Sequence, residues 1–78
     1  MAVGAEWDPE ILQHIGAQIR AGRQRLGMNQ DDFADLVGMH RAYIGMVENG
    51  KKDLRISTLY RLAIALDTDV CALLERCV

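Results

Sequence analysis

Residues 30–50, QDDFADLVGMHRAYIGMVENG, decide the fold of this chain. Two short amphipathic segments meet at Gly38, and Ala34, Ile44 and Val47 occupy the inward positions. Glycine supplies a turn conformation that a side chain disfavours, and Ala34 is small enough for a second helix to cross it closely. The stretch therefore predicts a helix-turn-helix arrangement, in which the outward side of the second helix is free to enter a DNA major groove.

The rest of the chain also has helical spacing of its apolar residues. Asp8 before Pro9 suits a helix start, and Gly27 suits the end of that helix. Its expected inward face is Ile11, Ile15, Ile19, Gly22 and Leu26. The spacing predicts an all-α fold, a compact five-helix domain, with helices over residues 9–26, 30–37, 40–49, 57–66 and 69–77.

Capping residues are expected at several of these helix starts. Asn29 suits the start of the second helix, and His40 is expected to cap the third helix or to contact phosphate. Either Asp53 or Ser57 could cap the fourth helix. The apolar face of the last helix is expected to be Val70, Leu73, Leu74 and Cys77.

The length of 78 residues suits one small domain. We expect residues 8–78 to form it and residues 1–7 to be a flexible tail. The longest apolar runs have five residues, far short of the about 20 that a membrane helix needs. No secretory signal is visible, so a cytoplasmic location with reduced thiols is expected. His14, His40 and the cysteines lack metal-ligand spacing, and the sequence predicts no metal, no cofactor and no enzyme activity.

The formal charge of −2 argues, taken alone, against a generic polyanion binder. The distribution of charge matters more than the total. Residues 11–55 hold seven of the nine basic side chains against five acidic ones. The acidic excess lies in residues 1–10 and 56–78, so the central segment is the one suited to DNA.

Over about residues 9–76 the chain resembles the phage-repressor and Cro-like (XRE-type) helix-turn-helix transcriptional regulators. The matching segments are IGAQIRAGRQRLGMNQ, FADLVGMHRAYIGMVENGK and STLYRLAIALDTDVCALL. The compact form, with HRAYI opening the third helix, is most similar to the controller proteins of restriction–modification systems. A phage repressor or an antitoxin of the same fold remains an alternative.

The resemblance implies a role for each matching position. It places the base-facing side chains in the third helix, the phosphate contacts around it, and an ion pair between the first and third helices. The base-facing set is Arg41, Ala42, Tyr43 and Met46; the phosphate set is Gln30, Asn49 and Lys51; the ion pair is Arg23 and Glu48. Because they follow the third helix directly, Lys52 and Arg55 are also expected to contact phosphate, and His40 is a further candidate.

The residue types suit these roles. Arg41 has the planar fork that fits guanine O6 and N7, worth about 1–3 kcal/mol of discrimination. Ala42 and Met46 offer apolar contact to thymine methyl groups. Gly45 costs roughly 1 kcal/mol of helix propensity, which fits a backbone that approaches DNA closely. Asp31, the acidic residue of the second helix expected nearest the phosphates, departs from this pattern.

Ile56, Tyr60 and Ile64 form a second apolar stripe on the fourth helix. An exposed stripe of this kind favours a dimer interface, although it could also be extra core under the last helix. A two-fold dimer would place two recognition helices about 34 Å apart on a palindromic operator. The rival hypothesis is a protein-interaction module that binds an unknown partner and does not use DNA.

Overall fold

The computed structural model describes residues 9–75 and forms an all-α fold, as the sequence predicts. The tail expected over residues 1–7, the Asp8 cap and Cys77 lie outside the described residues. Within them there are five helices and no strand. The helices are α1 (Pro9–Arg25), α2 (Gln30–Val37), α3 (Arg41–Glu48), α4 (Ile56–Ala65) and α5 (Val70–Leu74).

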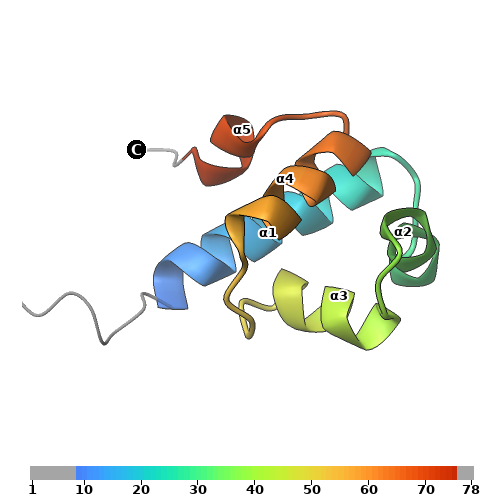
Figure 1. Cartoon of the computed structure of the whole chain (residues 1–78), viewed down its shortest axis with the longest axis horizontal. Helices are drawn as coiled ribbons and strands as arrows, with labels where there is room; N and C mark the ends of the chain where they lie inside the picture. Colours follow the sequence, from blue (N-terminus) through green and yellow to red (C-terminus); the bar gives the residue numbers. More distant parts are fainter. Residues whose placement is uncertain (1–8, 76–78) are drawn as a thin grey trace, which may run out of the picture.

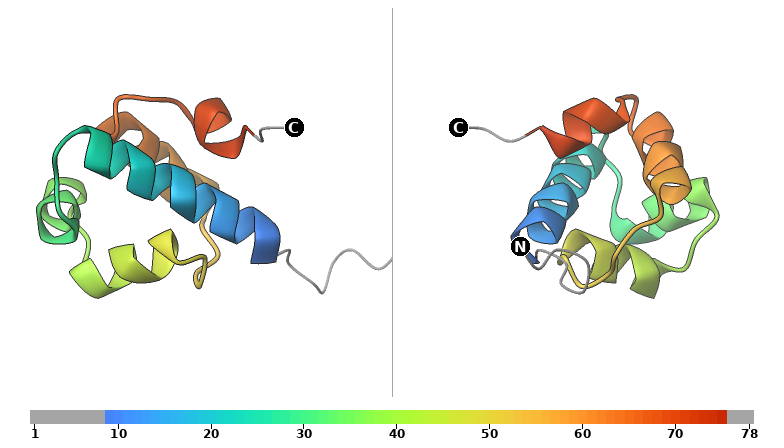
Figure 2. Two further views of the ribbon diagram at one scale, coloured as in Figure 1. Left: turned by 180° about the vertical axis from the view of Figure 1, so that it is seen from behind. Right: turned by 60° about the vertical axis from the view of Figure 1, so that its left-hand side comes forward.

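The long helix α1 runs through the middle of the molecule, with α3 on one side of it and α5 on the other (Figure 1). Helix α2 packs against α3 and α4, and α4 also contacts α5. The rear and rotated views show α2 and α3 joined by a tight turn at the side of the molecule opposite α5 (Figure 2). Helix α3 is therefore supported from behind by α1 and α2, and its other side is open.

The hydrophobic core draws on all five helices. Phe33, Ile19, Ile44, Leu62 and Val47 are its largest fully buried side chains. The inward positions expected for the second, third and fourth helices are buried, because their apolar residues recur at the spacing of one helix face. The core therefore fixes the angle between α2 and α3.

The inward face predicted for the first helix is partly wrong. Ile11 and Leu26 are exposed, and Leu12 is buried instead. Seven residues complete about two turns, so Leu12 lies almost above Ile19, whereas Ile11 lies about 80° around the helix from it. Leu26 follows the last residue of α1 and belongs to the turn that leaves it.

The predicted cap at Asn29 is present as a reciprocal pair. Its side-chain oxygen accepts a hydrogen bond from the backbone N–H of Asp32 at 2.7 Å, and the Asp32 carboxylate accepts one from the Asn29 N–H at 3.5 Å. At the other end of α2, Gly38 adopts the left-handed conformation with φ of 72°. Both ends of α2 are thus set by local sequence, which places the turn where α3 must begin.

The other predicted helix ends need correction. His40 occupies the N-cap of α3, but its side chain makes no capping hydrogen bond. Neither Asp53 nor Ser57 caps α4: the N-cap is Arg55, again without a side-chain bond, and Asp53 bonds the backbone N–H of Leu54 instead. Helix α5 ends at Leu74, short of the predicted residue 77, and Asp69 caps its start.

Candidate nucleic-acid interface

A buried ion pair joins α1 to the end of α3. Arg23 donates from Nε to Oε2 of Glu48 at 2.7 Å and from Nη2 to Oε1 at 3.0 Å. Its third nitrogen, Nη1, donates to the carbonyl oxygen of Met28 at 2.8 Å. The pairing implied by the sequence resemblance is therefore present, and its two-pronged geometry fixes the direction of both side chains.

Two further side chains reach the same carboxylate. Gln30, at the first position of α2, donates from Nε2 to Oε1 of Glu48 at 3.1 Å, and Nε of Arg20 lies 3.4 Å from that oxygen. Burial alone would raise the pKa of Glu48, but the hydrogen bonds from Arg23, Gln30 and Arg20 and the charge of Arg23 outweigh it and hold the pKa below its ordinary value. A single charged carboxylate thus links α1, α2 and α3.

A close backbone approach supports the same junction. A Cβ added to Gly16 would lie 2.6 Å from the carbonyl oxygen of Glu48, and one added to Gly50 would lie 2.8 Å from Cα of Gln13. Both glycines are buried, and Gly50 has φ of 71°. The sequence-based interpretation did not assign a role to Gly16. The only feature that could have indicated one is the presence of a glycine among the buried positions of an otherwise regular helix.

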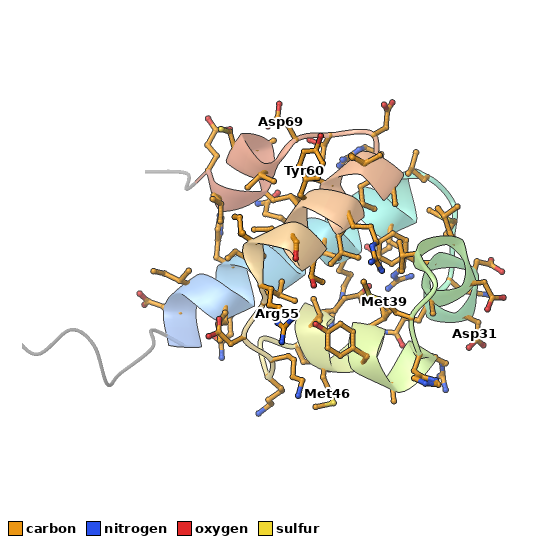
Figure 3. The ribbon with its side chains drawn as sticks, viewed as in Figure 1. Asp31, Met39, Met46, Arg55, Tyr60 and Asp69 are labelled. Carbon is orange, nitrogen blue, oxygen red and sulfur yellow. The ribbon has the colours of Figure 1, made fainter. Side chains whose placement is uncertain are left out.

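The outward side of α3 carries most of the predicted base-facing residues. Arg41, Ala42 and Met46 are exposed, and Met46 lies at the outer edge of α3 in Figure 3. Tyr43 is different, because it is half-buried and packs against the core. It also lines a shallow hollow beside the start of α3, together with Gly38, Met39, His40 and Thr58.

Arg41 has a partner on the neighbouring helix. Its Nε lies 3.4 Å from Oδ1 of Asp31, and the two side chains are 66% and 70% exposed. Asp31, the acidic residue that departs from the pattern expected of phosphate contacts, therefore lies beside the residue predicted to read guanine. Within residues 9–75 the two terminal nitrogens of Arg41 have no hydrogen-bond partner, and the side chain is 66% exposed.

The predicted phosphate contacts fall into two groups. Lys51, Lys52, Arg55 and His40 are exposed, around the two ends of α3. Gln30 and Asn49 instead take part in the network behind α3: Gln30 bonds Glu48, and Asn49 accepts a hydrogen bond from Nη2 of Arg20 at 2.9 Å. Arg20, absent from the sequence-based set, therefore adds a half-buried cation next to Asn49.

A second contact that the sequence did not predict lies at the C-terminal end of α2. Arg61 of α4 donates from Nη1 to the carbonyl oxygen of Val37 at 3.3 Å. A cation suits this position because the last carbonyl groups of a helix are unpaired and carry partial negative charge. The contact ties α4 to the turn that precedes α3.

The apolar stripe on α4 lies on the surface of the chain. Ile56, Tyr60 and Ile64 are 70%, 60% and 59% exposed, so they are not extra core beneath α5. In Figure 3, Tyr60 lies on the opposite side of the molecule from Met46. A partner bound along this stripe would leave the outer edge of α3 open.

Comparisons with known proteins agree with this geometry. The Helix-turn-helix family model matches residues 19–73. The control protein C.SmaI of Serratia marcescens is 37% identical over 67 residues, 86% of this chain and 80% of C.SmaI. The ImmF control region 10 kDa protein of Bacillus phage phi105 is 34% identical over 56 residues, 72% of this chain and 62% of the phage protein.

A solved structure gives the same result in three dimensions. The restriction-modification controller protein C.AhdI from Aeromonas hydrophila superposes with a TM-score of 0.75 at 34% identity, covering 80% of this chain and 94% of C.AhdI. The fold and the site thus define a helix-turn-helix regulator of transcription. The chain belongs to the Helix-turn-helix family, which confirms the resemblance drawn from sequence. Such regulators are not enzymes, as the sequence predicts.

Over residues 9–75, no three histidine, cysteine or acidic side chains gather in a way that could hold a metal ion. Within the same residues, none of the helices has the length and apolar character needed to span a membrane.

Proposed function

We propose that this protein binds operator DNA as a homodimer and that α3 enters the major groove. The observation that carries the proposal is the Glu48 network: one buried carboxylate holds α1, α2 and α3 together, so that Arg41, Ala42 and Met46 project from a rigid support. A rigid reading helix lowers the entropy cost of recognition. Such a support suits a face of α3 that binds a partner of defined geometry.

Each exposed residue has a chemical role in this proposal. The fork of Arg41 reads guanine O6 and N7, while Ala42 and Met46 contact thymine methyl groups. Lys51, Lys52, Arg55 and His40 bind phosphates on both sides of the groove, since they are exposed around the ends of α3. Gln30 and Asn49 assist from the Glu48 network, and Tyr43 contributes its exposed edge.

The dimer uses the stripe of Ile56, Tyr60 and Ile64. An apolar face exposed at three successive turns of one helix is typical of a surface that a partner covers. A two-fold dimer that pairs through this stripe would present two copies of α3. Their spacing would be about 34 Å, which matches adjacent major grooves of a palindromic site. Residues 8–78 are then both the DNA-binding and the dimerisation unit, preceded by the tail at 1–7.

The preferred biological role is control of a restriction–modification locus and of the protein's own promoter. The similarity to C.SmaI and C.AhdI supports this subtype. The similarity to a phage control-region protein supports the alternative of a phage repressor; an antitoxin is the third possibility. In each of these roles the protein would act in the cytoplasm, where its operator is.

The test is selection of bound duplexes from a random-sequence pool, followed by binding measurements on the selected site. We expect a palindromic site and a preference over scrambled DNA that Arg41→Ala abolishes while the melting temperature is unchanged. Equal discrimination by Arg41→Ala would show that Arg41 does not read the site.

A protein-interaction module is the second candidate, favoured by the exposed stripe on α4 and the net charge of −2. The salt dependence of binding separates the two, because each neutralised phosphate adds about 0.9 to the slope of log affinity against log salt. Several phosphate contacts predict a steep slope. No binding to duplex DNA at about 50–200 mM salt would favour the interaction module.

A further inference from the structure

We propose that Asp31 is a positioning residue for Arg41, and that it sets sequence selectivity by holding the guanidinium in the orientation that reads a base. The inference rests on the proposed function, since it assigns a role within the same DNA-binding surface. It starts from a charge that the proposed function leaves unexplained, namely a carboxylate next to a surface that must approach phosphates.

The geometry of the pair supports this role. Asp31 faces Nε of Arg41 at 3.4 Å, which is the nitrogen at the back of the guanidinium. The two terminal nitrogens remain available, and they are a matched pair of donors for guanine O6 and N7. The carboxylate can therefore keep its contact while the arginine reads a base.

The placement of the two residues is also favourable. Asp31 lies in the first turn of α2, and Arg41 is the first residue of α3. Gln30, the neighbour of Asp31, is bound to the buried Glu48, so the backbone that carries Asp31 is fixed relative to α3. Asp31 lies on the outer side of α2 (Figure 3), next to Arg41 at the start of α3.

The charge of Asp31 acts in a second way. An arginine at the rim of a groove can bind any phosphate, and such contacts carry no sequence information. Asp31 repels phosphates and attracts the guanidinium, so it disfavours the phosphate-bound arrangement of Arg41. Base readout retains the ion pair and phosphate binding breaks it, so the pair favours operator over other DNA.

The experiment measures the affinity of wild type and Asp31→Asn for the selected operator and for a scrambled duplex of the same length. We expect Asp31→Asn to bind the operator about two- to fivefold more weakly, the range that an exposed ion pair supports. It should bind the scrambled duplex at least as tightly as wild type. The ratio of the two affinities then falls.

Asp67→Asn is the matched control. Asp67 lies after α4 with φ of 59°, a conformation that asparagine tolerates, and the substitution makes the same change in net charge away from α3. It should alter both affinities equally and leave their ratio unchanged. If Asp31→Asn instead raises the affinity for both duplexes by the same factor, Asp31 acts only through its negative charge, without regard to DNA sequence, and the proposal is overturned.

Two further measurements separate positioning from a structural effect. Replacing the guanine read by Arg41 should cost Asp31→Asn less affinity than it costs wild type, and changes elsewhere in the operator should cost both the same. In an Arg41→Ala background, Asp31→Asn should no longer change the ratio; a persisting change would overturn the proposal. If wild type prefers no sequence at all, the proposed function fails as well, whereas loss of the Asp31 effect alone leaves it standing.

Discussion

Gly16 of α1 lies directly against the main chain of Glu48 at the end of α3, where a Cβ would stand 2.6 Å from the Glu48 carbonyl oxygen. The neighbouring carbonyl carbon would be 2.8 Å away. These are backbone atoms, so they cannot move aside as the end of a flexible side chain could. The position of α3 against α1 therefore depends on the absence of a side chain at Gly16.

Gly16→Ala should destabilise the protein, although alanine favours a helix over glycine by about 1 kcal/mol. Overpacking of this kind costs about 1–3 kcal/mol, so we expect a net loss in the free energy of unfolding measured with urea. Gly22→Ala is the control, because the three atoms nearest its Cβ would all be side-chain atoms, two of Leu66 at 3.3 and 3.4 Å and one of Arg25 at 3.5 Å. Equal stability of the two variants would contradict the close approach at Gly16.

Glu48→Gln should lower the free energy of unfolding at neutral pH by about 3–5 kcal/mol, because it leaves Arg23 buried without a counter-charge. The pKa of Glu48 is lowered in the folded protein. Its charge therefore stabilises the fold above the unfolded-state value of about 4.3, and this stability is lost as the pH falls through the folded pKa. The difference between wild type and Glu48→Gln should shrink as urea unfolding is repeated at pH values falling below about 4. A constant difference would show that the ion pair is not its source.

Gly45→Ala should separate stability from DNA binding. A Cβ at this position would lie 3.8 Å from Oε1 of Gln30, an ordinary contact, so the gain in helix propensity of up to about 1 kcal/mol should raise the melting temperature. If the α3 backbone must approach DNA closely, operator affinity should fall in the same variant. If Gly45→Ala is more stable but its operator affinity is unchanged, the DNA does not approach Gly45 closely.

Ile64→Asp should convert the proposed dimer into a monomer, because it puts a charge into an apolar interface. Light scattering or sedimentation at matched concentrations measures the mass, and the same variant should bind a full palindrome no better than a half-site. Leu36→Asp is the matched control, since Leu36 is 58% exposed on α2 and lies outside the stripe. A wild-type protein that is monomeric at micromolar concentration would exclude this interface.

Periodicity in the sequence predicted most of the fold, because the positions of Phe33, Ile44 and Leu62 follow from one helix face each. Local chemistry predicted the ends of α2, where Asn29 and Gly38 act within a few residues. The errors concern features that neither kind of signal encodes. Ile11 and Leu12 are adjacent in the sequence and both are apolar. Only the packing of α1 against the other helices decides which of the two is buried.

The candidate site was predictable in part for a similar reason. The exposed residues of α3 follow from the helical pattern and the resemblance, and so does the pair of Arg23 and Glu48. The contributions of Arg20 and Gln30 to Glu48, and of Asp31 to Arg41, join helices whose separation the sequence does not state. These contacts could be recognised only once the helices were placed.

The Glu48 network also bears on how this protein could acquire a new target. The atoms that fix α3 all lie behind it, whereas Arg41, Ala42 and Met46 make no contribution to the buried core. Substitutions at those three positions therefore carry little risk of unfolding the domain. Variants with altered operators should be reachable one residue at a time, so the domain is a suitable scaffold for laboratory evolution of regulators with new DNA specificity.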